Sequence, residues 1–392
     1  MKTVVRAGFL AIAFAGNGWS AEWSFEPSFS ARGEYNDNLT LSALPHDAVW
    51  GAWLTPDLKV KGATETMDIK TGAAADFVSY RGGKDTNFTN LNFPLLARYH
   101  SEQDALMLDT SFVRDNTLIG ELQQTGVVVS FTQRNRLVVA PSWTHALTEK
   151  LAFQGGYQFN DVTYEDGVQF NLFNYTLHAG NAGLSYNLTE RDTLLGMGHY
   201  VDFTVPQAQL HSTYYGFHLT LTHAFSESFT ASASGGFRTI SSESSTVTPP
   251  ATDRTSVGLF SASVEKKFER GLLRLEGARE INPSGLGLLL QTDRASLRAE
   301  RDVTERLTAA FYGSIYWTQS VATRDNTRTF PDNRYFRIEP RLSYRVTERW
   351  TVSGSYSYSY RDIAVPGDLQ RASANATYLM VTYHPLKLSV SR

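Results

Sequence analysis

The chain contains no cysteine. It can therefore form no disulfide, no thiolate metal site and no Cys-x-x-Cys-His haem attachment. Its nine histidines are scattered singly, and none follows another at the His-x-x-x-His spacing of helical zinc sites. We expect neither a metal nor another cofactor.

Long hydrophobic runs are missing as well. No uninterrupted apolar stretch approaches the roughly 20 residues that a membrane-spanning helix needs, and hydrophobic residues make up only 42% of the chain. A basic excess is also absent, because the formal net charge is −3. Nucleic-acid binders carry a basic stripe, so we expect no nucleic-acid partner.

Catalytic signatures are equally scarce. Barrel hydrolases bring a nucleophile, a histidine and an acid to one point, and no Gly-x-Ser-x-Gly motif occurs here. His218 and Asp202, which could face inward from adjacent strands, are the nearest approach to an acid–base pair. We therefore expect no enzymatic activity.

A short motif recurs along the chain at intervals of roughly forty residues. It consists of an apolar residue, a hydroxyl residue, a glutamate and usually a base. Arg345–Trp350 and Val303–Leu307 are close copies, and residues 188–191, 147–151 and 225–229 follow the same scheme. Such short polar connectors between apolar runs are typical of tight hairpins.

The runs between the connectors alternate apolar and polar residues, as in Trp350–Tyr360. Strict alternation at period two predicts strands with one apolar and one polar face. Runs of ten or more residues suit a tilted bilayer crossing. The sequence therefore predicts an all-β protein, a transmembrane antiparallel up-and-down barrel of about 18 strands, with 16 as the alternative. The last strand is expected over 372–388, and no loop appears long enough to form a plug.

The N-terminus has the features of a secretory signal peptide, with Lys2 and Arg6 before an apolar core over 7–16. We assign residues 1–20 to the signal peptide and 21–392 to a single barrel domain. Alternating strands after such a segment predict a multi-pass barrel in the outer membrane of a Gram-negative cell. Its partners would then be outer-membrane lipid and lipopolysaccharide. The sequence does not specify an oligomeric state.

Aromatic residues gather near the predicted strand ends. In a barrel they would form girdles at the two membrane interfaces, where a ring with a polar tip is stable. In a soluble sandwich they would instead fill a core, which leaves the strand lengths unexplained. The residues expected on this apolar face are Trp143, Tyr157, Phe159, Tyr186, Trp317, Trp350 and Tyr383.

If the apolar positions face lipid, the charges between them line the lumen. These charges are mostly arginines of the C-terminal third. In one interpretation arginine and glutamate side chains pair and brace the wall; in the other, the surplus arginines attract anions. The predicted lumen charges are Arg136, Arg274, Arg294, Arg298, Arg337, Glu339, Arg341 and Arg345.

Further tyrosines are expected in the lumen, among them Tyr200, Tyr214, Tyr312 and Tyr316. Their rings could provide faces along which sugars slide. They could equally fill space inside the barrel.

After the first mature strand the chain carries Tyr35, Asp37, Asn38 and Leu39. This pattern resembles the opening signature of an outer-membrane β-barrel family that accompanies exopolysaccharide biosynthesis and export in Gram-negative bacteria. The resemblance implies a plain meander and a role beside periplasmic export machinery, with an acidic polysaccharide as cargo. One departure is the last residue, Arg392, where barrels usually end on an aromatic. Either Tyr383 has that role or the final strand continues to Arg392.

Together these features predict an aqueous pathway with an arginine-rich lumen. The leading interpretation is a conduit or accessory for exopolysaccharide export. The alternative is a general or anion-preferring diffusion porin. A second alternative is a structural or adhesive barrel without an open lumen.

Overall fold

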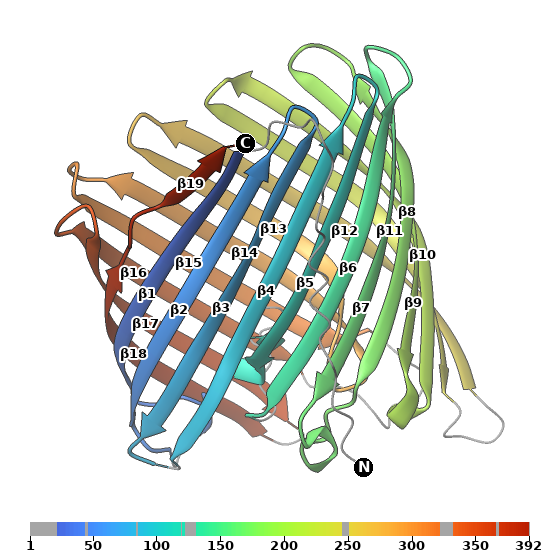
Figure 1. Ribbon diagram of the computed structural model, residues 1–392. Helices are drawn as coiled ribbons and strands as arrows, with labels where there is room; N and C mark the ends of the chain where they lie inside the picture. The colour runs from blue at the N-terminus through green and yellow to red at the C-terminus, as the bar shows by residue number, and fades with distance from the viewer. Residues whose placement is uncertain are drawn as a thin grey trace.

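The computed structural model describes residues 22–43, 46–83, 85–118, 120–121, 131–244, 251–321, 332–365 and 368–391. The predicted signal peptide, residues 1–20, lies outside the described residues. The strands stand side by side, tilted, in one wall that closes into a barrel (Figure 1). In the described part of the chain no helix is both long and apolar enough to span a bilayer.

Eighteen long antiparallel strands make up the wall, and one short strand follows them. The two short 3₁₀ helices are η1 (Gly167–Phe170) and η2 (Pro206–Ala208). The strands are β1 (Glu22–Asn36), β2 (Val49–Ala63), β3 (Met67–Arg81), β4 (Thr86–His100), β5 (Asp104–Asn116), β6 (Gln133–Ala146), β7 (Leu151–Tyr164), β8 (Tyr175–Asn187), β9 (Asp192–Val205), β10 (Leu210–Ser226), β11 (Phe229–Ser244), β12 (Ala251–Phe268), β13 (Gly271–Pro283), β14 (Leu289–Asp302), β15 (Leu307–Ser320), β16 (Asn333–Arg345), β17 (Trp350–Val365), β18 (Asp368–Tyr383) and β19 (Leu388–Ser391).

Each long strand pairs with the next along the chain, and β1 pairs with β18 to close the barrel. The closing ladder runs from Phe29 opposite Tyr383 to Asn36 opposite Ala376. The prediction of 18 strands is confirmed over the alternative of 16. Because one sheet closes on itself, the sandwich interpretation of the aromatics is wrong.

Period-two alternation separates the two faces of this wall, as β2 illustrates. Trp50 and Leu54 point outward with 65% and 60% of their surface exposed, while Trp53 between them packs inside against Tyr80 and Phe88. The predicted girdle residues lie on the outer face, and the rings of Trp350 and Tyr383 contact each other with centroids 4.9 Å apart. Large exposed apolar side chains on the outside suit contact with lipid.

The repeated turn motif has a local physical cause. In the copy between β14 and β15, Thr304 Oγ1 accepts hydrogen bonds from the backbone N–H groups of Arg306 and Leu307, at 3.2 and 2.9 Å. The hydroxyls of Thr148, Thr189 and Thr347 make the same pair of bonds in their turns. A hydroxyl that satisfies two free backbone donors stabilises a tight turn. The motif recurs because each of these hairpins needs that acceptor.

The end of the chain differs from the prediction of one strand over 372–388. β18 ends at Tyr383, and His384 donates its backbone N–H to the carbonyl oxygen of Arg349. Pro385 then interrupts the ladder because it has no N–H to donate. Pairing resumes in β19, which lies beside residues 22–25 of β1.

Described residues on either side of 122–130, between β5 and β6, pack inside the barrel. Leu118 packs against an inner cluster that includes Leu41 and Tyr316, whereas Phe131 packs against Phe88 with ring centroids 5.2 Å apart. Arg134 holds the start of β6 with 2% of its side chain exposed, through a bidentate pair with Asp115 at 2.8 and 2.9 Å.

The β13–β14 hairpin also bends inward. The ladder between β12 and β13 ends at Phe260 opposite Arg279, although β12 continues to Ala251 and β13 to Pro283. The ladder between β13 and β14 continues to Pro283 opposite Leu289. The half of the hairpin nearest its tip therefore separates from β12, while β13 and β14 stay paired with each other.

The bent hairpin tip, residues 284–288, contacts the loop between β7 and β8. The backbone N–H of Phe173 donates to the carbonyl oxygen of Gly285 at 2.7 Å. A Cβ at Gly285 would lie 2.5 Å from the hydroxyl of Tyr164, so only glycine allows this close approach. Tyr164 in turn donates a hydrogen bond to Glu121. The two inward-folded segments thus meet at Tyr164.

Around the contact at Tyr164 the inner face of the wall is lined by buried apolar side chains. The hairpin tip covers a cluster that includes Phe203 and Val205, both 0% exposed, and Ile240 at 2%. Burial of these side chains holds the tip in place by the hydrophobic effect. The element that enters the lumen here is the tip of a strand hairpin, whereas the expectation about a plug concerned the long loops.

Candidate functional site

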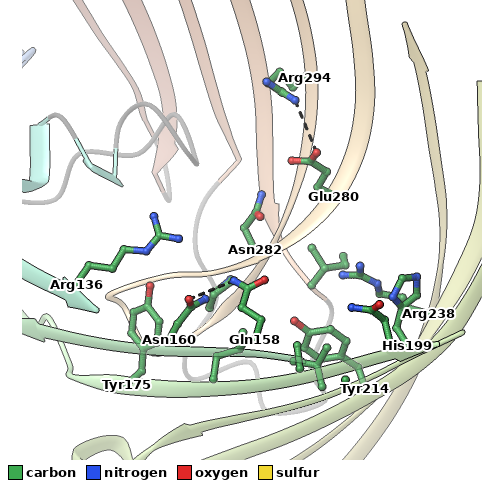
Figure 2. Close-up of a pocket in the computed structure, with 17 residues that line it drawn as sticks. Arg136, Gln158, Asn160, Tyr175, His199, Tyr214, Arg238, Glu280, Asn282 and Arg294 are labelled. Carbon is green, nitrogen blue, oxygen red and sulfur yellow. Dashed lines mark hydrogen bonds and ion pairs between the residues drawn. The ribbon is translucent and has the colours of Figure 1, made fainter. Parts of the chain in front are cut away.

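The candidate site is a cavity of 470 Å³ in the lumen, beside the bent hairpin (Figure 2). We name it the arginine cavity. Strands β6 to β11 form one side of it, and β13 and β14 form the other. Its lining includes Arg136, Gln158, Asn160, Tyr175, Leu177, Asn181, His199, Val201, Tyr214, Arg238, Glu280, Asn282 and Arg294.

Three guanidinium groups and one carboxylate supply the charge of the arginine cavity. Arg294 lies 3.7 Å from Glu280 and 3.9 Å from Glu276, both long for ion pairs. Arg238 lies over the ring of Tyr214, 5.3 Å from its centroid, and its Nε is buried without a hydrogen-bond partner. In the described part of the chain Arg136 has neither an ion pair nor a hydrogen bond. Cationic donors in this cavity therefore outnumber their acceptors.

Neutral polar groups fill the space between these charges. Gln158 Nε2 donates to Asn160 Oδ1 at 3.1 Å, as Figure 2 shows. His199 Nε2 lies 2.5 Å from Nδ1 of His218, which is on the neighbouring strand. Each amide offers both a donor and an acceptor. The wall can therefore bind hydroxyl groups as well as charge.

A second cavity, of 280 Å³, lies at the closure of the barrel beside β18 and β1. We name it the seam cavity. Its charged lining consists of Arg32, Glu34 and Arg337. Arg32 bonds to Glu34 at 2.6 Å and stacks over Trp53 with 3.9 Å between the guanidinium carbon and the ring centroid.

A third cavity, of 310 Å³, lies on β2 to β5, and we name it the lysine cavity. Lys59, Lys61 and Lys70 line it together with Asp57 and Asp109. Each of these three cavities therefore has one or two more cationic than anionic side chains in its lining.

The predicted arginine wall is present, and most of its members are paired. Arg337 and Arg341 both bind Glu339, at 2.8 and 2.7 Å. Two cations share one carboxylate here. The glutamate therefore braces the wall as the pairing interpretation expects, and one positive charge is left over.

The remaining predicted arginines differ in their partners. Arg274 bonds to Glu276, and Arg298 lies 3.3 Å from Glu300. Arg274 on β13 is the register partner of Arg298 on β14. Arg345 lies opposite Thr351 at the end of β16 and has no ion pair within the described residues.

Tyr200 was placed in the lumen by the sequence, and that placement is wrong. It pairs with Tyr215, the neighbour of the inward-facing Tyr214, and paired residues of a ladder share a face. Tyr200 is therefore on the outside, with 54% of its surface exposed. The misassignment arises because tyrosine is tolerated on both faces near a membrane interface.

The other predicted tyrosines do lie inside, and Tyr214 lines the arginine cavity. Tyr316 is only 3% exposed and packs against Tyr335, with ring centroids 5.8 Å apart. Its ring fills space and offers no free face. Tyr312 is 37% exposed and lies between Arg298 and Glu339 in the register, so its ring remains accessible from the lumen.

His218 and Asp202, which the sequence suggested as an acid–base pair, lie on opposite faces of the barrel wall. His218 points inward to His199, whereas Asp202 is on the outer face and contacts Nε2 of His211 at 2.7 Å. Among the described residues no group of three or more His, Asp or Glu side chains could hold a metal ion.

Sequence reasoning missed several residues of the arginine cavity, among them Arg238, Asn160 and Glu280. Strand alternation could have found Arg238, since it follows Phe237, which is outward and 51% exposed. No local pattern indicates that Glu280 lines the same cavity as Arg136 and Arg238, because the bend of the hairpin places it there.

The signature after the first strand has a structural role in closing the barrel. Asp37 accepts hydrogen bonds from the backbone N–H and the side-chain amide of Asn375, both at 2.7 Å. Asn38 is 1% exposed and donates to the carbonyl oxygen of Ser373. The signature therefore fastens the first loop to β18.

No family model and no curated protein matches the chain. Solved structures resemble it over nearly its whole length. OccAB3 of Acinetobacter baumannii has 12% identity and a TM-score of 0.46, covering 93% of this chain and 99% of that one. OccAB2 of the same organism has 14% identity and a TM-score of 0.47, with 93% and 98% covered. Pseudomonas aeruginosa OccK7 (OpdD) has 13% identity and a TM-score of 0.43, with 94% and 100% covered.

Because these TM-scores are below 0.5, the interpretation of this chain rests on its own strand pairing and lining residues. Its wall is closed, its outer face exposes many large apolar side chains, with aromatic ones near the strand ends, and its inner face carries the arginine wall. The chain is a multi-pass β-barrel of the outer membrane.

Proposed function

We propose that this barrel is a diffusion channel that prefers small anionic solutes. The observation that carries the proposal is the charge of the three cavities. The linings contain three arginines with one glutamate, two arginines with one glutamate, and three lysines with two aspartates. Fixed cations along a water-filled path favour anions over cations.

The inward-folded segments support small solutes as cargo. Glu280 and Asn282 of the bent hairpin line the arginine cavity, and Leu118 and Phe131 line the seam cavity. These two cavities, of 470 and 280 Å³, are of a size that suits small molecules. The role in exopolysaccharide export that the signature implies receives no support from the comparisons or from this geometry. Diffusion is therefore the better proposal.

Conductance of the purified barrel in planar lipid bilayers tests the proposal. We expect discrete steps of constant size from single proteins. A structural or adhesive barrel without an open lumen would give no conductance steps under any applied voltage. That result would contradict the channel proposal.

A further inference from the structure

A hollow of 1070 Å³ lies on the outer face of the barrel, where it crosses the wall from β15 through β18 and β1 to β2. We name it the outer groove. Register partners on neighbouring strands share a face, and two rows of such partners form its sides. One row is Trp50, Tyr35, Thr377 and Tyr356, and the other is Gly33, Leu379, Gly354, Leu342 and Ala309.

The floor of the outer groove is backbone. Between its two sides runs a row of residues whose side chains point into the lumen, among them Glu34, which binds Arg32, and Arg341, which binds Glu339. The main chain of this row belongs to the strand ladders, so its polar groups are already hydrogen-bonded. The floor therefore suits an apolar ligand.

The outer groove runs obliquely down the surface that faces lipid. Trp50 is the second residue of β2, after a long extracellular connection, whereas Ala309 is the third residue of β15, after a short periplasmic turn. A strand spacing of about 4.8 Å gives the groove a length of roughly 24 Å. An acyl chain needs about 15 Å to cross one leaflet, which is half of the hydrocarbon core. The groove is therefore long enough for one acyl chain.

The extracellular mouth of the outer groove combines aromatic rings with a cation. Tyr35 and Trp50 lie there with ring centroids 4.8 Å apart, and such rings with a polar tip are stable at the level of lipid headgroups. Arg81 is the register partner of Trp50, so its side chain lies on the same outer face. Its ion pair with Asp85 is long, at 3.6 Å. This guanidinium therefore suits a phosphate of a lipid headgroup.

Two glycines leave space along one side of the outer groove. Gly33 and Gly354 lie inside β1 and β17, where glycine weakens a strand and often marks the close approach of a ligand. Among the described residues, an added Cβ would meet nothing within 4 Å at Gly33, and at Gly354 only the carbonyl oxygen of Tyr378, at 3.8 Å. No packing within the wall therefore requires glycine at these two positions.

We propose that the outer groove binds one acyl chain of lipopolysaccharide, the phosphorylated glycolipid of the outer leaflet, with a headgroup phosphate beside Arg81. The groove is continuous with the face that contacts the bilayer, where Leu342 and Leu379 are 56% and 61% exposed. Its mouth lies at the extracellular end of β2, which the outer leaflet surrounds. The site lies outside the lumen, so it does not depend on the channel proposal.

Native mass spectrometry of the folded barrel in detergent, titrated with purified lipid A, tests this inference. We expect one lipid A to stay bound to each barrel after the detergent is removed. Phosphatidylethanolamine should bind at least about ten-fold more weakly, because its ammonium group offsets the charge of its phosphate. Equal binding of the two lipids would overturn the assignment to lipopolysaccharide, and so would the absence of bound lipid A.

Leucine variants locate the lipid on the barrel. Gly33→Leu and Gly354→Leu fill the outer groove, so each should lower the ratio of lipid-bound to free barrel at least about ten-fold through lost contacts. Gly235→Leu on β11 is the matched control, because Gly235 pairs with the exposed Phe260 and an added Cβ there also meets none of the described residues within 4 Å. Gly235 lies outside the groove. Equal losses in all three variants would contradict the assignment.

A variant of the mouth tests the position of the headgroup. Arg81→Gln should weaken the binding of lipid A and leave the weaker binding of phosphatidylethanolamine unchanged, because it removes a cation and no apolar contact. Unchanged lipid A binding would overturn the placement of the phosphate. A dimer of the parent barrel that Gly354→Leu abolishes would show that a second copy covers the groove, which would overturn the lipid. Heat-modifiable migration on gels verifies that each variant is folded.

Discussion

The backbone N–H of Phe173 lies 2.7 Å from the carbonyl oxygen of Gly285 and donates a hydrogen bond to it. This bond joins the bent β13–β14 hairpin to the loop between β7 and β8, which are distant strands in the wall. The contact explains how a simple meander can have a narrow interior. The hairpin also carries Glu280 and Asn282 into the arginine cavity.

The break in the wall can be tested by cross-linking, because the protein has no native cysteine. Ala262 and Gly277 are partners in the β12–β13 ladder. We expect Ala262→Cys with Gly277→Cys to form a disulfide, since partners across an antiparallel pair come within bonding geometry. Non-reducing electrophoresis after protease cleavage between the strands measures it.

The control is the double variant Gly258→Cys with Ile281→Cys. These two residues would lie opposite each other if the β12–β13 ladder continued in the same register. We expect no disulfide there, because β13 has turned away from β12. Efficient bridging of both pairs would mean that the wall is continuous.

Arg134 stabilises the junction of the inward-folded segments. Its side chain is 2% exposed, and its partners Asp115 and Glu121 are 11% and 10% exposed. Arg134→Ala leaves two buried carboxylates without their cation, so we expect unfolding free energy to fall by about 3–5 kcal/mol. Urea unfolding in lipid vesicles measures this loss.

Lys59→Ala is the control for that measurement. Lys59 is 66% exposed and lies 3.8 Å from Asp57, so its removal should change the free energy by about 0–1 kcal/mol. Similar losses in both variants would refute the special role of Arg134.

The turn hydroxyls should contribute measurably to stability. Thr347 Oγ1 accepts from the N–H groups of Arg349 and Trp350, at 3.2 and 3.1 Å. Thr347→Ala should lower the unfolding free energy by about 1 kcal/mol, the usual net value of a hydrogen bond. Thr347→Ser retains the acceptor and should stay near the parent. A serine variant as unstable as the alanine variant would show that the methyl group matters instead.

Substitutions of Glu339 and of its partner Arg341 should shift the anion selectivity of the channel in opposite directions. It is the shared partner of Arg337 and Arg341, so Glu339→Gln adds net positive charge to the lumen and should strengthen anion preference. Arg341→Gln should weaken it. Arg279→Gln is the control, because Arg279 pairs with Asp293 on the outer face at the start of the bend. Reversal potentials measure all three, and shifts of the same sign for Glu339 and Arg341 would contradict the prediction.

Alternation and turn chemistry made most of the wall predictable. Arg337, Glu339 and Arg341 alternate with apolar neighbours, so their inward orientation follows from period two alone. The face on which Tyr200 lies could not be predicted in this way, because tyrosine suits either face near the membrane interface.

The inward bend was not predictable from alternation, because β13 and β14 keep their register with each other through the bend. A compositional signal does exist. The hairpin tip and the residues after it read Gly285-Leu286-Gly287-Leu288-Leu289, which is too apolar for a loop that faces water. The cavity followed from this bend and therefore escaped prediction as well.

We expect water to fill a path along the cationic lumen. The reversal potential of the unmodified barrel in a planar bilayer, under a KCl gradient, tests it most directly. We expect a potential whose sign corresponds to chloride crossing more readily than potassium. A potential of the opposite sign, or a membrane that stays insulating, would contradict it.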